Sequence, residues 1–411
     1  MTDWLDTLLE SSKESESPER YFWWAGLTAI SATLGKRVYL QRGPFYRLYP
    51  NIYVALVSAR SGLRKGIPIM TAKKLVNDLN SIRVISGCNS IQALTKELSM
   101  QQTFSSGAVV NEAQGLMISD EFESFITEDP RALTYLTALH NTHEHEDSWK
   151  KRLKGSPLEE LKSPCLTLLV ASNEALFESM VKQKDIEGGF IARTFIVHES
   201  KRKLINDLMY TEDEIENLLN KNTKSHEILL NRLKEIRKLS GKIILSSEAT
   251  ILYRSWYEQI ANSEVEDKTG SFDRLGDQVL KVAMLVSVSN SDSLIINEQD
   301  LIKAISASEA CIINARAISM EKEKGDINPV IEKVLKELIK AVDQTITRKR
   351  LMTNTHIESM ILDRALDTLI QRGAIDEPKR NSRKEIFYKM KKEVYETYVK
   401  FKSSEKKEKV N

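Results

Sequence analysis

The segment Gly115-Leu116-Met117-Ile118-Ser119-Asp120-Glu121-Phe122 is a short apolar run that ends in two adjacent carboxylates. Such a run is typical of a buried strand in an α/β sheet, whose carboxyl edge is where ligands bind. Asp120 at that edge can hold a Mg²⁺ ion on a nucleotide, and Glu121 can polarise a water molecule against the γ-phosphate. An apolar strand that ends in a polar turn is the alternative, so the interpretation depends on a phosphate-binding segment elsewhere.

A candidate phosphate loop lies upstream, at Ala59-Arg60-Ser61-Gly62-Leu63-Arg64-Lys65-Gly66, between a strand predicted over 51–58 and a helix predicted over 69–79. Such a loop offers backbone N–H groups and a helix N-terminus to phosphate, and its lysine reaches the β- and γ-oxygens. The residues predicted to bind the nucleotide are Ala59, Ser61, Gly62, Arg64, Lys65 and Gly66. Two of them depart from the usual loop, because Ala59 replaces its first glycine and Gly66 replaces the hydroxyl residue that binds Mg²⁺. A basic strand–helix turn is the alternative.

Composition limits the class of protein. The chain has 411 residues, a length that fits roughly two to four domains. Charged residues make up 29% of it, and its formal net charge of +2 does not by itself indicate a binding partner. Cys88, Cys165 and Cys311 are far apart in the sequence, so we expect neither a disulfide framework nor a zinc site. We expect the protein to work in a reducing compartment. There is no apolar run of about 18 residues and no secretion signal, so we expect no membrane span and a cytoplasmic protein.

The apolar pattern predicts five successive segments. Strands alternate with helices in the second segment, which predicts a parallel sheet covered by helices, and amphipathic helix dominates the third. Charged residues, Gly325 and Pro329 predict a break at 321–329. The segments are an N-terminal helical lead-in over 1–45, an α/β core over 46–200, a helical subdomain over 201–325, a C-terminal module over 326–402 and a disordered tail over 403–411.

The C-terminal module is predicted as a winged helix. Helices are expected over 330–341 and 357–372, and Gly373 is expected to stop the second one. Two strand-like runs, 374–377 and 386–390, flank a polar, basic tip. Helices followed by a basic hairpin are typical of winged-helix modules, which bind either DNA or another protein.

The order and spacing of these motifs resemble the AAA+ ATPases, and within them the minichromosome-maintenance (MCM) type replicative helicases of phages and mobile elements. The resemblance covers roughly residues 50–320. It implies an α/β AAA+ P-loop core with a parallel sheet, an all-helical lid and a C-terminal winged helix. It also implies ATP and Mg²⁺ as cofactors, with Asp120-Glu121-Phe122 as the Walker B motif.

Three further motifs carry the resemblance. Ser172-Asn173 after an apolar run is similar to sensor 1, in which Asn173 would position the attacking water. Gly189-Phe190-Ile191-Ala192-Arg193 is similar to the arginine-finger segment, so Arg193 would reach the γ-phosphate of a neighbouring subunit. Arg274 resembles the sensor-2 arginine of the lid. A helix cap at Asn173, a structural Arg193 and an ordinary charged helix start at Arg274 are the alternatives.

Two basic regions are candidate DNA contacts. The run Trp149–Gly155 lies where MCM-type proteins carry a hairpin in the ring's central channel, and its cations could follow a single strand. The winged helix offers a second, duplex contact. The candidate residues are Lys150, Lys151, Arg152 and Lys154 in the first region and Arg364, Arg372, Lys379, Arg380, Arg383 and Lys384 in the second. Solvated charge in the first region and protein docking in the second are the alternatives. His140, His143 and His145 form a local cluster, predicted as a solvated loop rather than a metal site.

These features predict an ATP-dependent DNA helicase or translocase that works in the replication of a phage or mobile genetic element as a homo-oligomeric, hexameric ring. A primase or initiator of the same element is a further candidate partner. The alternative is a nucleotide-binding but hydrolytically weak initiator or helicase loader that binds DNA through its winged helix. Gly66 favours this alternative, whereas Asp120, Glu121, Asn173 and Arg193 favour the helicase. A packaging motor would need a metal-dependent nuclease domain, which the C-terminal module does not offer.

Overall fold

The computed structural model describes residues 3–58, 61–87, 90–120, 122–128, 131–140, 148–151, 159–174, 189–204, 209–262, 270–355, 357, 359–371, 373–380, 385–392 and 394–395. The chain divides into two compact units, Met1–Ile318 and Ser319–Asn411.

A five-stranded, all-parallel sheet is the centre of the first unit. Its strands are β3 (Tyr53–Ser58), β4 (Val84–Ser86), β7 (Gln114–Ser119), β10 (Cys165–Asn173) and β11 (Thr194–His198). Their spatial order is β11-β3-β10-β7-β4. Every residue of β3 is buried, as expected for a central parallel strand that is covered on both faces. The predicted parallel sheet covered by helices is therefore confirmed.

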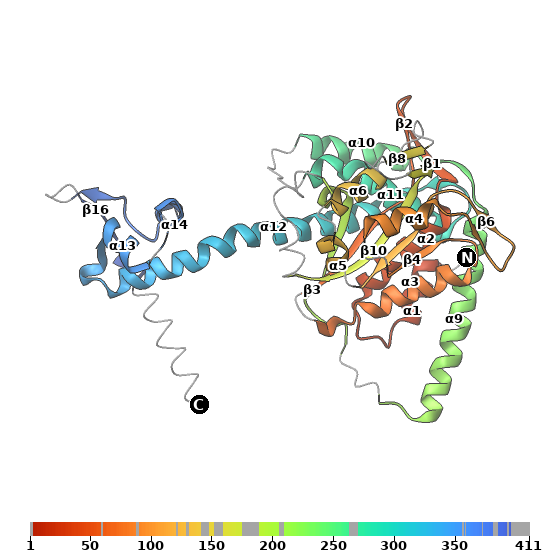
Figure 1. Cartoon of the computed structure of the whole chain (residues 1–411), viewed down its shortest axis with the longest axis horizontal. Coiled ribbons are helices and arrows are strands. Elements are labelled where there is room, and N and C mark those ends of the chain that lie inside the picture. Colours follow the sequence, from red (N-terminus) through yellow and green to blue (C-terminus); the bar gives the residue numbers. More distant parts are fainter. Residues whose placement is uncertain are drawn as a thin grey trace. The chain divides into compact units, whose positions relative to one another are not determined.

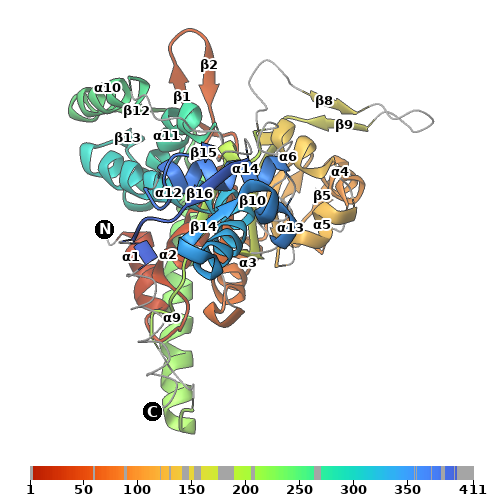
Figure 2. The ribbon, with the colours of Figure 1, turned by 90° about the vertical axis from the view of Figure 1, so that its left-hand side faces the viewer.

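Helices cover both faces of this sheet (Figure 2). Alternate residues of β3 separate into the two cores, with Val54 and Leu56 in one and Tyr53, Ala55 and Val57 in the other. This is the two-residue period of a strand buried on both sides. The first core also contains residues of α1 (Trp4–Ser11), α2 (Glu19–Leu34) and α3 (Gly66–Asp78), and the second contains residues of α4 (Ile91–Ser99), α5 (Phe122–Glu128) and α6 (Ala132–His140).

A smaller four-stranded sheet joins distant parts of the chain. Its order is β13 (Ile295–Ile296), β12 (Gly241–Leu245), β1 (Val38–Arg42) and β2 (Tyr46–Leu48). β1 pairs in parallel with β12 and antiparallel with β2. Residues 1–45 and 201–325 are largely helical, as predicted, but the first segment also contributes β1 and the second contributes β12 and β13, which the prediction lacked. The pairing of Val38 with Gly241 is a long-range contact that local sequence cannot reveal.

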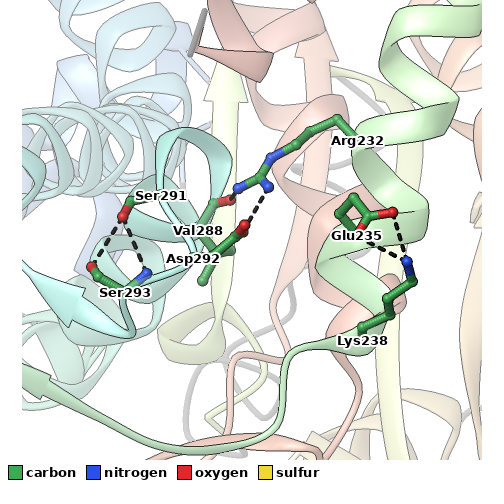
Figure 3. Close-up of polar contacts among 7 residues, drawn as sticks. All are labelled: Arg232, Glu235, Lys238, Val288, Ser291, Asp292 and Ser293. Carbon is green, nitrogen blue, oxygen red and sulfur yellow. Dashed lines mark hydrogen bonds and ion pairs between the residues drawn. The ribbon is translucent and has the colours of Figure 1, made fainter.

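Further helices of the first unit, in the part of the chain that the structure describes, are α9 (Glu212–Lys238), α10 (Ser247–Ala261), α11 (Ser271–Asn290) and the start of α12 (Glu298–Lys340). The amino-terminal part of α9 extends away from the sheet (Figure 1). Its other end buries Leu229, Leu233 and Ile236 at helical spacing. There Arg232 donates to Asp292 Oδ1 at 2.6 Å and to the Val288 carbonyl at 2.9 Å, which ties α9 to the end of α11 (Figure 3).

Two short antiparallel hairpins lie between the strands of the large sheet. β5 (Gln102–Thr103) pairs with β6 (Val109–Val110), and β8 (Ser148–Lys151) pairs with β9 (Glu159–Lys162). The second hairpin ends three residues before β10 begins, so it leaves the sheet at the amino end of that strand.

The second unit combines helices with a three-stranded antiparallel sheet. Along the chain the elements are the end of α12, η3 (Val342–Gln344), β14 (Thr345–Thr347), α13 (Arg348–Thr355), α14 (Ser359–Gln371), β15 (Lys379–Arg380) and β16 (Ile386–Lys389). The sheet order is β14-β16-β15. Gly373 ends α14 as predicted, with φ +68° and the paired bonds Gly373 N–H to Ile370 O and Ala374 N–H to Leu369 O.

The structure corrects two details of this region. The predicted break at 321–329 does not interrupt the helix, because α12 runs through Gly325 and Pro329, although the boundary between the two units lies nearby, at Ile318 and Ser319. The Glu- and Lys-rich residues around these positions have high helix propensity, which offsets the cost of the glycine and the proline. The first strand of the predicted hairpin is also displaced: β15 is Lys379–Arg380, and Ile375 contributes only a single bridge to Met390.

Among the described residues, no helix is both long enough and apolar enough to cross a membrane.

Candidate functional site

The carboxyl ends of three neighbouring strands meet at one edge of the large sheet. Asn173 on β10 lies level with Ser58 on β3, and Val170 lies level with Ser119 on β7. The chain leaves β3 toward β4 on one side of the sheet and leaves β10 toward β11 on the other. Loops of β3 and β10 therefore diverge, and such a switch point is where open α/β sheets bind ligands.

The candidate phosphate loop follows β3 at this switch point. It contains a short 3₁₀ turn, η1 (Ser61–Leu63), and leads into α3 at Gly66, three residues earlier than predicted. The side chain of Lys65 turns back to the sheet, and its Nζ donates to Ser58 Oγ at 2.5 Å. Burial lowers the pKa of Lys65. Within the described residues no carboxylate pairs with Lys65, so its charge is directed at the sheet edge without a counterion.

Unlike Lys65, Arg64 is fixed by contacts with the N-terminal segment. It has φ +52°, and its carbonyl accepts a hydrogen bond from Ser17 Oγ at 2.9 Å. Its Nε lies 3.1 Å from Glu16 Oε2, and Arg202 donates to the other oxygen of Glu16 at 2.7 Å. Glu16 is only 3% exposed. A buried carboxylate shared by two guanidinium groups therefore ties the loop to the N-terminal segment and to the segment after β11.

Two glycines of the loop have different surroundings. A Cβ on Gly62 would lie 2.8 Å from Arg202 NH2, so this position accommodates the guanidinium. A Cβ on Gly66 would meet nothing within 4 Å, so the start of α3 has room for a side chain. Pro68 lies in the first turn of α3, where its missing N–H costs no helical hydrogen bond. Ala59 lies outside the described residues, as does the side chain of Ser61.

The predicted carboxylates and the sensor residue follow the neighbouring strands. Asp120 is exposed directly after β7. Glu121 lies outside the described residues. Asn173 is the last residue of β10 and is half-buried, and its carbonyl accepts a hydrogen bond from Ser172 Oγ at 3.1 Å. Lys65, Asp120 and Asn173 thus come from adjacent elements at one edge, which suits a metal-bound phosphate.

Arg193 and Arg274 lie at the opposite, amino edge of the sheet. Arg193 ends η2 (Ile191–Arg193), directly before β11. It is 5% exposed, and its NH1 donates to the Gly189 carbonyl at 2.8 Å. Burial, and then the charge of Arg274, lowers the pKa of Arg193 to about 10. Gly189 has φ +75°, and a Cβ there would lie 2.5 Å from Arg193 NH1. Arg274 is exposed in the first turn of α11.

Both arginines line a groove of about 420 Å³ together with a buried lysine that the sequence did not single out. Lys281 is 5% exposed, and its Nζ donates at 2.9 Å to both the carbonyl and Oδ1 of Asn51. His140 Nε2 lies 3.4 Å from the same nitrogen. Burial lowers the pKa of Lys281 to about 8. His140 is buried at 8% exposure, so its prediction as part of a solvated loop is wrong.

No group of three or more metal-ligating side chains occurs among the described residues. His143 and His145 lie outside them.

The candidate DNA contacts are placed only in part. Lys150 and Lys151 lie on β8, across from Glu160 and Glu159 on β9, an opposite-charge register that reduces the net charge of this hairpin. Their side chains lie outside the description, as do Arg152 and Lys154. Lys379 and Arg380 are exposed on β15. Arg364 lies on α14, and its side chain is outside the described part, as are Arg372, Arg383 and Lys384.

Sequence analysis missed Ser58, Glu16, Arg202 and Lys281. Ser58 could have been predicted from the sequence, because it is a polar residue that ends an apolar strand before a basic loop. Such a position lies at the carboxyl edge of a parallel sheet, where ligands bind. The others come together only through long-range packing.

The chain matches no protein-family model, and comparison with curated proteins gives no match either.

Proposed function

We propose that this chain is an ATP-binding protein of the AAA+ kind that couples nucleotide hydrolysis to movement along DNA, as an MCM-like helicase or translocase does. The α/β core would bind ATP and Mg²⁺ at the carboxyl edge of the five-stranded sheet. Lys65 would contact the β- and γ-phosphates, Asp120 would hold Mg²⁺, Glu121 would polarise the attacking water and Asn173 would orient it.

The observation that carries this proposal is the order of the strands. β10 lies between β3 and β7, so Asn173 comes between the strand that leads into the candidate phosphate loop and the strand that leads into Asp120. The AAA+ resemblance requires these three motifs to meet at one site, although they are far apart in sequence. A fold in which β10 lay at an edge would separate them.

The placement of Arg193 supports a shared active site. It lies at the amino edge of the sheet, whereas Lys65 lies at the carboxyl edge, so the two residues cannot serve the same nucleotide within one chain. An arginine that assists hydrolysis from there would serve a neighbouring copy, as in a ring. Mixing Arg193→Ala protein with Lys65→Ala protein should then restore part of the hydrolysis that each variant lacks alone. A fully active monomer would contradict this arrangement.

Charge and topology support a nucleic-acid role for the second unit. Residues 319–411 hold 22 Lys and Arg against 16 Asp and Glu, whereas residues 1–318 hold 38 against 42. The β15–β16 hairpin follows α14, as the wing of a winged helix follows its recognition helix. We propose that α14 and this hairpin contact duplex DNA, and that the helices from α9 to α12 serve as the lid.

ATP turnover with and without single-stranded DNA tests the proposal. The expected result is Mg²⁺-dependent hydrolysis that DNA stimulates. In a second arm, residues 1–318 alone should keep the basal hydrolysis and lose duplex binding, because they form a compact unit of their own. If truncation leaves duplex binding unchanged, the second unit is a protein-docking module.

A nucleotide-binding initiator or helicase loader is the second candidate, and Gly66 favours it. The start of α3 carries no hydroxyl to bind Mg²⁺, although the structure has room for one. The absence of hydrolysis on any DNA, together with intact ATP binding, would select this candidate.

A further inference from the structure

The β1–β2 hairpin presents an aromatic side chain to solvent. Its tip is Gly43-Pro44-Phe45, with Gly43 at φ +55°. Phe45 is 76% exposed, whereas most phenylalanines of this unit are buried in its cores. Figure 2 shows the hairpin standing clear of the neighbouring elements at the top of the view. Exposing a phenylalanine at a hairpin tip has a hydrophobic cost, so such a residue is a candidate contact for a ligand.

The hairpin also lies in a region of one charge sign. Residues 20–77 contain ten Lys and Arg and no Asp or Glu. This segment includes both the hairpin and the phosphate loop. Arg47 on β2 is oriented by the ring of Tyr39, with its Cζ 4.2 Å from the ring centroid. Aromatic side chains and cations alternate along the hairpin, which is the composition of surfaces that bind single-stranded nucleic acid.

The groove beneath the hairpin has the same character. It is lined by Phe45, Tyr46, Arg47 and Tyr49 from the hairpin segment and by Arg193, Arg274 and Lys281 from other elements. Two acids, Asp273 and Asp277, also line it.

Asp277 is already neutralised, because it accepts from Tyr46 Oη at 2.7 Å and lies 3.1 Å from Arg42 Nε. Gln278 on the groove wall is 6% exposed, and its Oε1 has no hydrogen-bond partner among the described residues. A groove of about 420 Å³ with excess positive charge and an unsatisfied buried amide fits a ligand of nucleotide size.

Topology places this hairpin beside the other basic hairpin. β2 ends shortly before β3, and β9 ends shortly before β10. β3 and β10 are adjacent and parallel, so both hairpins leave the sheet at its amino edge. Figures 1 and 2 agree in showing β2 and β8 on the same side of the unit. This edge is opposite to the Lys65 site, so a strand bound here leaves the candidate nucleotide site of the same chain open.

We infer that the β1–β2 hairpin and the groove beneath it bind single-stranded nucleic acid, with Phe45 stacking on an unpaired base and Arg47 and Arg274 contacting phosphates. A single strand is required because a duplex keeps its bases stacked on each other, which leaves no base face for Phe45. The site goes beyond the proposed function, since it requires neither bound ATP nor hydrolysis.

The test is the binding of a fluorescently labelled oligo(dT) to the full chain without nucleotide. Phe45→Ala should weaken binding about 5-fold or more, the effect of losing one stacked base, whereas Phe45→Trp should bind at least as tightly as the parent. Leu219→Ala is the matched control, because Leu219 is 60% exposed on the amino-terminal part of α9, which extends away from the sheet, and its loss should leave binding unchanged. Arg47→Gln should lower the log–log salt slope by about 0.7, the value of one phosphate contact on a single strand.

Three outcomes would overturn the inference. Phe45→Ala could bind oligo(dT) as tightly as the parent, or it could weaken duplex binding equally, which would show that stacking is not involved. It could instead change only the oligomeric state in light scattering, which would assign the tip to a protein interface. Failure of the proposed function can be told apart from failure of this inference. If only the proposed function is wrong, ATP turnover is absent but the parent protein still binds oligo(dT).

Discussion

At the carboxyl edge of the five-stranded sheet, Lys65 donates to one hydroxyl, whereas at the amino edge Lys281 is enclosed by an amide, a carbonyl and an imidazole. Lys65 is half-buried and can exchange its neutral partner for a phosphate oxygen at little cost. Lys281 is buried and hydrogen-bonded within the chain, so it holds Asn51 and His140 in place. The comparison separates a cation that is free to bind a ligand from one that supports the structure.

The largest effect is expected at the carboxyl edge. Glu121→Gln should lower ATP turnover by about 10²- to 10⁴-fold, because it removes the carboxylate that polarises the attacking water. The glutamine side chain keeps the size and shape of the glutamate. ATP binding should be unchanged. Steady-state turnover and equilibrium ATP binding measure the two effects, with Glu123→Gln, two residues further along the chain in α5, as the control. Turnover at the parent rate in the Glu121 variant would remove this residue from the mechanism.

A pH-dependent effect is expected at the amino edge. The pKa of Lys281 is about 8 in the folded chain, below its unfolded value. Between these values the unfolded chain binds more protons than the folded one, so stability rises with pH above about 8. The rise should be about 2 kcal/mol between pH of about 7.5 and about 9.5. Lys281→Met should lack this contribution in urea unfolding at the two pH values. Equal pH slopes in both proteins would show that Lys281 is not buried as a cation.

Strands that were continuous apolar runs could be predicted from the sequence. β3, β7 and β10 are each buried along most of their length, so their composition alone marks them. β1 could not, because Gln41 and Arg42 make it look polar and its partner β12 lies far along the chain. The continuity of α12 across Pro329 was missed because a proline is a strong local signal against a helix.

The candidate site was predictable where it follows a strand end. Asp120 and Asn173 come directly after apolar runs and Lys65 lies on the loop that follows one, so topology brings them to one edge once the strands are parallel. The pairing of Arg64 with Glu16 was not predictable, since it joins residues on different elements. Neither was the burial of Arg193, which depends on close approach to Gly189.

The smallest expected effect sharpens the comparison within the phosphate loop. Gly66→Ser supplies a hydroxyl at the position where the usual phosphate loop carries one, and a Cβ there meets nothing within 4 Å. If the site binds Mg²⁺ on a nucleotide, Mg²⁺-dependent turnover should rise roughly tenfold, the equivalent of one added charge-assisted contact. Gly66→Ala, which adds the carbon without the oxygen, is the control. Equal turnover in the Gly66→Ser and Gly66→Ala variants would show that a hydroxyl at position 66 does not bind the Mg²⁺ ion.

We expect the carboxyl edge to bind ATP through Lys65, and this binding is measured by titration calorimetry of ATP on the Lys65→Ala variant. Loss of the charge-assisted contact should weaken binding by about 2 kcal/mol or more. Lys74→Ala removes an exposed cation from the same helix and should leave binding unchanged. If the Lys65 variant binds ATP as tightly as the parent, the loop after β3 is not a phosphate loop and the account is contradicted.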